Sequence, residues 1–210
     1  MAQTAAQIVD TLAAGRDLAH ETAIREIRAE ILALPSIRKH RLSNTEFSTR
    51  EFVLVRVRLE NGIEGIGEAA VLGGPRWAEE SVESIQAVIL RYLAPALEGC
   101  SASNPAEAAA RMGRAAFRNN SAKGALETAI FDALARTLDV PLATLFGGAL
   151  RSRVPVLWAL ASGDADQEVA EAQDKLALRE HRDFKIKLGF ASPEEDMRRL
   201  THLREGVPGM

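Results

Sequence analysis

The short segment DFKIKLGF, Asp183–Phe190, carries the residues best suited to chemistry, because Lys185 and Lys187 stand one residue apart among apolar neighbours. In a strand, side chains alternate between two faces, so the two lysines would share one face. The other face would carry Phe184, Ile186 and Leu188. A lysine beside another cation and partly desolvated has a depressed pKa, because both effects disfavour the ammonium form. It can then act as a base near neutral pH, for instance on a proton α to a carboxylate.

Two interpretations of the lysine pair stay open from its residues alone. The plainer one is the solvated face of an edge strand. The other follows from its position between two helical segments, because a strand inside a barrel or a doubly wound sheet has no free face opposite its helices. In a barrel that face points inward, and residues at the carboxyl ends of the strands line the active site.

The elements around the lysines follow a strand–helix–strand–helix order that begins at Arg151. Val154–Leu160 is a continuous apolar run, and a helix is expected after Asp166. Ser192 opens a second helix as a capping box, with proline in the first turn. The residues expected to face inward are Val169, Ala172, Leu176 and Ala177 in the first helix, and Met197, Leu200 and Leu203 in the second. This order predicts parallel strands covered by helices and joined by right-handed crossovers.

The first half of the chain begins with three predicted strands, at residues 25–33, 51–59 and 63–69. The first has a period-two pattern of apolar and charged residues, and the second is rich in β-branched residues. Asn61-Gly62 lies between the second and third strands and predicts a hairpin with a type I′ turn, which needs positive φ at both central residues. Together the three strands predict an antiparallel meander.

Four helical segments follow the meander. The first is expected to end at Pro95, the second to begin at Asn104-Pro105, the third to span Ser121–Leu138, and the short fourth to run from Pro141 to Gly147-Gly148. The expected inward residues are Val82, Ile85, Val88, Ile89 and Tyr92 in the first, Met112, Ala116 and Phe117 in the second, and Leu126, Ala129, Ile130, Ala133 and Leu134 in the third. The predicted fold class is therefore an α+β domain followed by the start of a (β/α) barrel.

The composition is that of an ordinary globular protein, with 47% hydrophobic and 26% charged residues and a net charge of −3 over 210 residues. The basic residues are scattered, which argues against a nucleic-acid partner. The single cysteine, Cys100, excludes an internal disulfide framework and is expected to be inert. No apolar run approaches the roughly 20 residues that span a bilayer, and no signal peptide is evident. We therefore expect a cytoplasmic protein with no membrane partner.

Several segments, taken in order, resemble the muconate-lactonizing branch of the enolase superfamily. They are IRKHRLS (37–43), GIGEA (65–69), LGGPRW (72–77), YLAPALEG (92–99), SAKGALETAIFDA (121–133), PLATLFGG (141–148), LASGD (160–164) and FKIKLG (184–189). The resemblance implies a capping domain at residues 1–150, of which residues 1–22 are an extension. It also implies that residues 151–210 are the first two βα units of a TIM-like barrel.

The resemblance further implies roles for particular residues. Lys187 matches the base that exchanges the proton α to the substrate carboxylate, and Lys185 matches its electrostatic neighbour. Contacts to a small dicarboxylate substrate are expected from two loops of the capping domain, through His40, Ser43, Leu72 and Gly73.

The resemblance also implies a bound Mn²⁺ or Mg²⁺ ion, whose acidic ligands are expected beyond Met210. Glu194, Glu195 and Asp196 stand at a helix N-terminus, where negative charge favours the helix dipole, and we interpret them as caps rather than ligands. The 210 residues alone are therefore expected to have neither a high-affinity metal site nor activity.

The implied activity is that of a muconate cycloisomerase, which converts cis,cis-muconate to muconolactone. The alternatives are a dipeptide epimerase or an o-succinylbenzoate synthase of the same superfamily, or a non-catalytic truncated fragment. The resemblance also implies a homo-oligomer.

Overall fold

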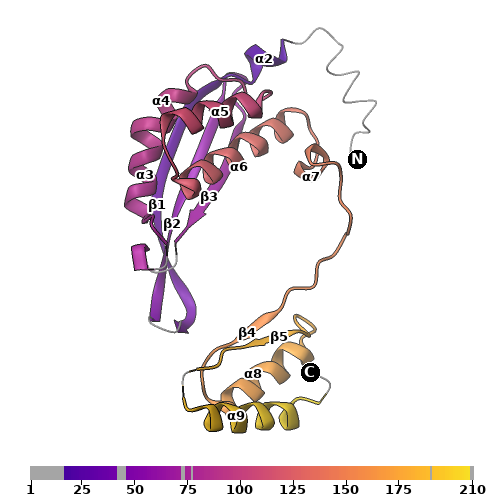
Figure 1. Cartoon of the computed structure of the whole chain (residues 1–210). Helices are drawn as coiled ribbons and strands as arrows, with labels where there is room; N and C mark the ends of the chain where they lie inside the picture. Colours follow the sequence, from indigo (N-terminus) through magenta and orange to yellow (C-terminus); the bar gives the residue numbers. More distant parts are fainter. Residues whose placement is uncertain (1–16, 42–45, 72–73, 77, 190, 209–210) are drawn as a thin grey trace. The chain divides into compact units, whose positions relative to one another are not determined.

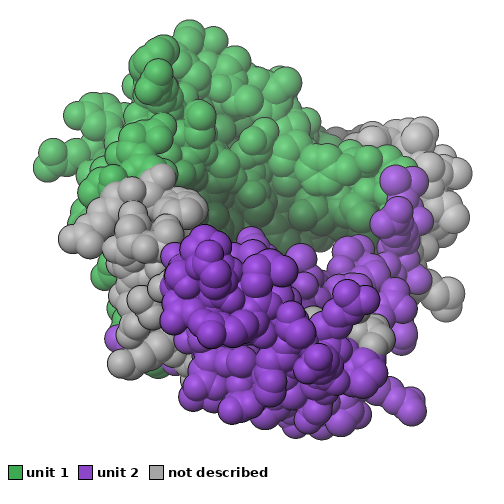
Figure 2. Space-filling view, turned by 60° about the horizontal axis from the view of Figure 1, so that its bottom comes forward, with its two compact units in different colours: residues 1–35, 49–149 green, residues 36–48, 150–210 purple. Residues whose placement is uncertain are grey.

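The computed structural model describes residues 17–41, 46–71, 74–76, 78–189 and 191–208. Contacts divide the chain into two compact units, which are coloured separately in Figure 2. The first contains residues 1–35 and 49–149, and the second contains residues 36–48 and 150–210. The predicted domain boundary at residue 150 stays a prediction, and the two units are described separately below.

The first unit is built on a three-stranded sheet, and the prediction of an antiparallel meander is confirmed. The strands β1 (Ile24–Arg41), β2 (Glu46–Leu59) and β3 (Glu64–Ala70) lie in the order β1-β2-β3. A short helix, α2 (Leu18–Glu21), precedes them. In β2, alternate residues are fully buried because they face the helices, namely Val53, Val55, Val57 and Leu59.

The turn between β2 and β3 differs from the predicted type I′ turn. Gly62 has φ +84°, but Asn61 is not among the described residues with positive φ. The Gly62 N–H donates to the Leu59 carbonyl, and the Leu59 N–H donates to the Ile63 carbonyl. This is a three-residue loop with glycine in the left-handed region, the other common way to close a hairpin. The Asn61 side chain instead accepts from the Ile63 N–H and donates to the Thr137 hydroxyl. Thr137 is the last residue of the helix α6 (Asn120–Thr137), so this hydrogen bond connects the turn to that helix.

The helices of the first unit gather on one side of the sheet (Figure 1). The first helical segment does not end at Pro95 as expected. It consists of α3 (Val82–Val88), a π-helical turn η2 (Ile89–Leu93) and α4 (Ala94–Leu97). The wider π turn inserts one residue and precedes a proline that has no N–H to donate. The insertion moves the inward position from Tyr92, which is 56% exposed, to the fully buried Leu93.

The remaining helices largely follow the predictions. α5 (Pro105–Ala115) is capped by Asn104, whose side chain accepts from the Glu107 N–H. It ends before Phe117, which is 86% exposed, so the predicted burial of this residue is wrong. α6 (Asn120–Thr137) buries all five residues predicted for it, and α7 (Leu142–Leu145) follows Pro141 and ends before two glycines with positive φ.

Two glycines of β3 allow α6 to lie directly against the sheet. A Cβ placed on Gly67 would come within 1.9 Å of the Ala125 carbonyl oxygen, and one on Gly65 within 2.1 Å of the Ala129 carbonyl oxygen. Both alanines of α6 are themselves buried. Glycine facing alanine therefore sets the short distance between sheet and helix, which gives the GIGEA segment a physical explanation.

The second unit contains two strand–helix pairs, as predicted. β4 (Trp158–Leu160) pairs in parallel with β5 (Phe184–Ile186), and α8 (Ala165–Ala177) and α9 (Pro193–Gly206) pack on the sheet (Figure 1). The residues of their common core are Leu160, Ala172, Leu203 and Val207, with Trp158, Val169, Phe184 and Ile186 packed against them.

Several details of the second unit differ from the predictions. β4 is shorter than the predicted strand, and Val154, Val156 and Leu157 are exposed, because β5 pairs with only three residues. α8 begins at Ala165 and its N-cap is Asp164, two residues before the expected Asp166. Of its four expected inward residues, Leu176 and Ala177 are exposed.

The close approach of β3 and α6 leads to a stability prediction. Gly67→Ala should lower the free energy of unfolding by about 3 kcal/mol, because the added methyl group overlaps helix backbone that cannot move independently. Gly124→Ala in α6 is the matched control, because nothing lies within 4 Å of a Cβ there. It should raise stability by about 0.5–1 kcal/mol through helix propensity. Urea unfolding followed by circular dichroism measures both; equal stabilities for the two variants would contradict the packing argument.

Candidate functional site

The lysine segment forms a strand of three residues, Phe184–Ile186, so the predicted alternation of two lysines on one face is seen only in part. Phe184 and Ile186 pack toward α8 and α9, while Lys185 stands exposed in β5. Lys187 follows the last residue of β5 and is half-buried. Leu188 is 54% exposed, so its predicted packing against the helices is wrong. The chain has left the strand at this point, and Gly189 turns it away with φ +88°.

The backbone that follows the Lys187 amide is held by side chains of α9. The Lys187 N–H donates to the Leu160 carbonyl at 3.4 Å, which is a long contact at the end of the ladder. The Lys187 carbonyl accepts a hydrogen bond from the Arg199 guanidinium. Two residues later, the Gly189 N–H donates to Asp196 Oδ2 at 2.6 Å. The position of Lys187 therefore depends on α9 as well as on the sheet.

Two buried charged residues form these contacts, a third pairs with one of them, and sequence reasoning missed two of the three. They are Glu168 of α8, with Asp196 and Arg199 of α9. Asp196 was predicted to be a helix cap, but its carboxylate binds Gly189 and Arg199 instead. Met197, expected inside, is 60% exposed because Asp196, Arg199 and Leu203 occupy the inward face of α9. The i, i+3 spacing of Asp196 and Arg199, in line with Leu203, was the available signal.

The structure does not describe the side chains of the four residues predicted to contact substrate. His40 belongs to β1 by its backbone, but its side chain lies outside the described part of the structure, as do Ser43, Leu72 and Gly73. Glu195 caps α9, since its carboxylate accepts from the Ser192 N–H, and this hydrogen bond holds its pKa below the ordinary value. Among the described residues, no group of three or more histidine, cysteine, aspartate or glutamate side chains could hold a metal ion.

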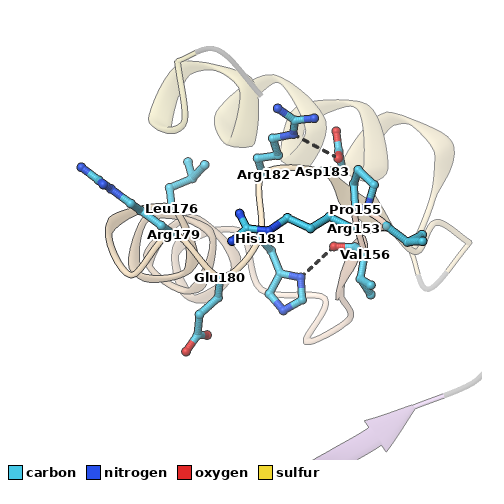
Figure 3. Close-up of a pocket in the computed structure, with 10 residues that line it drawn as sticks. Arg153, Pro155, Val156, Leu176, Arg179, Glu180, His181, Arg182 and Asp183 are labelled. Atoms are coloured by element: carbon cyan, nitrogen blue, oxygen red, sulfur yellow. Dashed lines mark hydrogen bonds and ion pairs between the residues drawn. The ribbon is translucent and has the colours of Figure 1, made fainter. Parts of the chain in front are cut away.

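A hollow of about 750 Å³ lies in the second unit, but at the opposite end of the strands from Lys187. Its walls are residues 153–156, which precede β4, Leu176 in the last turn of α8, and residues 179–183, which lie between α8 and β5. Figure 3 shows Arg182 turned toward Asp183, and the His181 ring bonded to the Val156 carbonyl. Active sites of (β/α) barrels lie at the carboxyl ends of the strands, so this hollow is not the place for lysine chemistry.

Comparison with known proteins identifies the family. The model of the mandelate racemase / muconate lactonizing enzyme N-terminal domain matches residues 26–147. The chain belongs to this family. Its match includes β1, β2, β3 and the helices that cover them, so this part of the fold is the family's N-terminal domain.

Curated relatives and solved structures extend the likeness into the lysine segment. The chain is 40% identical over 187 residues to muconate cycloisomerase 1-2 of Acinetobacter lwoffii, covering 89% of this chain and 48% of the relative. It is 43% identical over 184 residues to chloromuconate cycloisomerase of Cupriavidus pinatubonensis, covering 88% and 50%. The structure of muconate lactonizing enzyme from Pseudomonas fluorescens complexed with muconolactone aligns with TM-score 0.85 and 39% identity, covering 90% and 51%. The chain thus spans about half the length of these relatives.

The described residues contain neither a membrane-spanning helix nor an exposed cysteine nucleophile. None of the described helices has the length and apolar character that a membrane crossing requires. Cys100 is 1% exposed, and its burial raises the pKa of the thiol above the ordinary value. Because the thiolate is the reactive form, this cysteine is unsuited to act as a nucleophile.

The burial of Cys100 leads to a reactivity prediction. In the folded chain at pH 8, its reaction with a disulfide reagent should be at least about 100-fold slower than in guanidinium, since the thiol is reached only through opening of the core. Glu98→Cys in a Cys100→Ser background provides an exposed thiol as the control. Equal rates for the two thiols in the folded state would show that Cys100 is accessible.

Proposed function

We propose that this chain carries the capping domain and the catalytic lysine strand of a muconate cycloisomerase. The observation that supports this most directly is the position of Lys187. It is half-buried just past the carboxyl end of β5, beside a parallel strand whose helices cover the other face. The cycloisomerase names of the relatives favour this chemistry over a dipeptide epimerase or an o-succinylbenzoate synthase.

The proposed reaction is an intramolecular addition on a small dicarboxylate. One carboxylate oxygen of cis,cis-muconate forms a C–O bond to the conjugated diene, and the electron pair moves toward the carbon α to the second carboxylate. The Lys187 ammonium then gives its proton to that carbon, which leaves muconolactone and a neutral amine. In reverse, the neutral amine removes the same proton. Lys185 presents a second cation on the same face of the strand, where it favours the negative charge of the intermediate.

The metal ion stays a prediction of the family resemblance. A Mn²⁺ or Mg²⁺ ion would act as a Lewis acid toward the substrate carboxylate. Such ions need several oxygen ligands that converge on one point. The part of the chain that the structure describes has no group of three or more acidic, histidine or cysteine side chains that could hold a metal ion. The homo-oligomeric state, the cytoplasmic location and the contacts of His40, Ser43, Leu72 and Gly73 with substrate also stay predictions.

A fusion tests the role of Lys187. Residues 1–210 would be joined to the carboxyl-terminal half of the Acinetobacter lwoffii relative, and the loss of muconate absorbance would be measured. Lys187→Ala should reduce turnover by about 10²–10⁴-fold, the usual contribution of a positioned proton donor. It should also abolish exchange of the muconolactone α proton with deuterated solvent. Lys185→Ala should retain that exchange and shift the pH–rate profile.

Lys175→Gln is the control for removal of a lysine from the same unit. Lys175, near the carboxyl end of α8, pairs at 2.6 Å with Glu180, which lies between α8 and β5 and so before the strand that leads to Lys187. This variant should therefore keep the parent rate. An active parent fusion whose Lys187→Ala variant turns over muconate normally would refute the assignment of Lys187.

A further inference from the structure

We propose that Glu168, Asp196 and Arg199, named here the buried triad, position Lys187 for proton transfer. This inference rests on the proposed function of Lys187, but its structural part stands on contacts within the second unit. All three side chains are buried, at 0%, 7% and 7% exposure, although each carries a formal charge. The proposed reaction uses Lys187 and Lys185 and does not involve these three side chains directly.

The two carboxylates of the buried triad occupy equivalent places in successive strand–helix units. Glu168 stands in the first turns of α8 and Asp196 in the first turn of α9. Each accepts a hydrogen bond from the backbone N–H of a glycine in the loop between the strand and the helix of its unit. The Gly163 N–H, after β4, donates to Glu168 at 3.0 Å, and the Gly189 N–H, after β5, donates to Asp196 at 2.6 Å. Both glycines have positive φ, +79° and +88°. Each carboxylate therefore fixes the reversal of the chain that follows its strand.

Arg199 joins the two carboxylates and reaches the lysine loop directly. Its Nε lies 3.1 Å from Glu168 Oε2, and its Nη1 lies 3.1 Å from Asp196 Oδ1. Its Nη2 donates to the carbonyl of Lys187. Asp196 and the Lys187 carbonyl accept hydrogen bonds from two arms of the guanidinium fork, whereas Glu168 lies within ion-pair distance of Nε without hydrogen-bond geometry. The carbonyl of Lys187 and the amide of Gly189 are thus held by adjacent members of one buried cluster.

This arrangement matters because the sheet alone holds Lys187 weakly. β5 is only three residues long, and its pairing with β4 ends at Ile186. A side chain that must reach a reacting carbon needs a fixed backbone, since a displacement of about 1 Å can cost about 100-fold in rate. Apolar residues of similar volume would fill the space of the buried triad but could neither donate to the Lys187 carbonyl nor accept from the two glycines. Buried ion clusters often add little net stability, which makes a positioning role the better explanation of this one.

A hydrogen bond between side chains of the same two helices provides a matched comparison. His202 of α9 lies 2.8 Å from Asp166 of α8, on the exposed side of the two helices. It connects the same elements as the buried triad but has no described contact with Lys187 or with either glycine. Asp166→Asn therefore removes a link between α8 and α9 without touching the lysine loop.

The structural part of the proposal can be tested by amide hydrogen exchange on the 210-residue chain. Arg199→Lys keeps a positive charge beside the two carboxylates, but its single ammonium group cannot bridge both of them and the Lys187 carbonyl. Exchange at Gly163 and Gly189 should become about 10- to 100-fold faster, as expected for a lost or loosened hydrogen bond to a charged group. Exchange in the middle of α8 and α9 should stay within about twofold of the parent, because the apolar core is unchanged.

Uniformly faster exchange across the second unit would show a purely structural role and overturn the proposal, as would unchanged exchange at both glycines. Asp166→Asn should leave the two glycines as slow as in the parent. If Arg199→Lys does not fold, Asp196→Asn, which is nearly isosteric, is used with the same criteria. With this variant the faster exchange is expected at Gly189.

The catalytic part is tested in the fusion described above. Arg199→Lys should lower kcat about tenfold or more with KM within about twofold, because the variant moves the proton donor without altering contacts to substrate. Asp166→Asn should match the parent. A normal kcat for Arg199→Lys, together with an inactive Lys187→Ala, would refute positioning and leave the proposed function intact. A normal kcat for Lys187→Ala would refute the proposed function, whereas the exchange at Gly163 and Gly189 would still show whether the buried triad holds the loops.

Discussion

The burial of one guanidinium constrains the second unit more than any other interaction. Arg199 cannot lose its charge, so it must keep acceptors around it wherever it is buried. Asp196 and the Lys187 carbonyl accept hydrogen bonds from it, and Glu168 adds a second negative charge at ion-pair distance. Those three partners come from α8, from α9 and from the segment after β5, so satisfying one side chain fixes three parts of the unit at once. The apolar core of four buried residues is small, and it could not impose this arrangement by itself.

The first unit is organised by a different constraint, which is the short distance between α6 and β3. Side chains on both elements are reduced to glycine or alanine at the contact, so backbone atoms meet almost directly. The π turn in η2 then adapts the helices beside them to the same sheet, since it carries Ile89 and Leu93 into the core while the three residues between them are exposed.

Much of the fold could be predicted because local patterns and tertiary contacts agree. The alternation in β2, the apolar face of α6 and the capping box at Ser192 each specify an element without reference to the rest of the chain. The errors arose where a tertiary contact overrode the local pattern. Tyr92 is exposed because a π turn shifts the helix register, and Met197 is exposed because charged residues take the inward face of α9.

The candidate site shows the same division. The lysine pair was evident from its spacing, since β-strand alternation is a local property. The buried triad was not, because a charged residue in a sequence is usually solvated and only the partners reveal that it is buried. Glu168 and Arg199 are 31 positions apart, and nothing in either helix alone indicates that they meet.

The glycine contact repeated after β4 and β5 has a consequence for how this half of the protein tolerates change. Each strand–helix unit contains its own means of closing its loop, a first-turn acid bonded to a left-handed glycine. Residues between the glycine and the helix can then vary in type, and even in number, without altering the register of the strands. The two units already differ in this way, since one residue separates Gly163 from α8 and three separate Gly189 from α9.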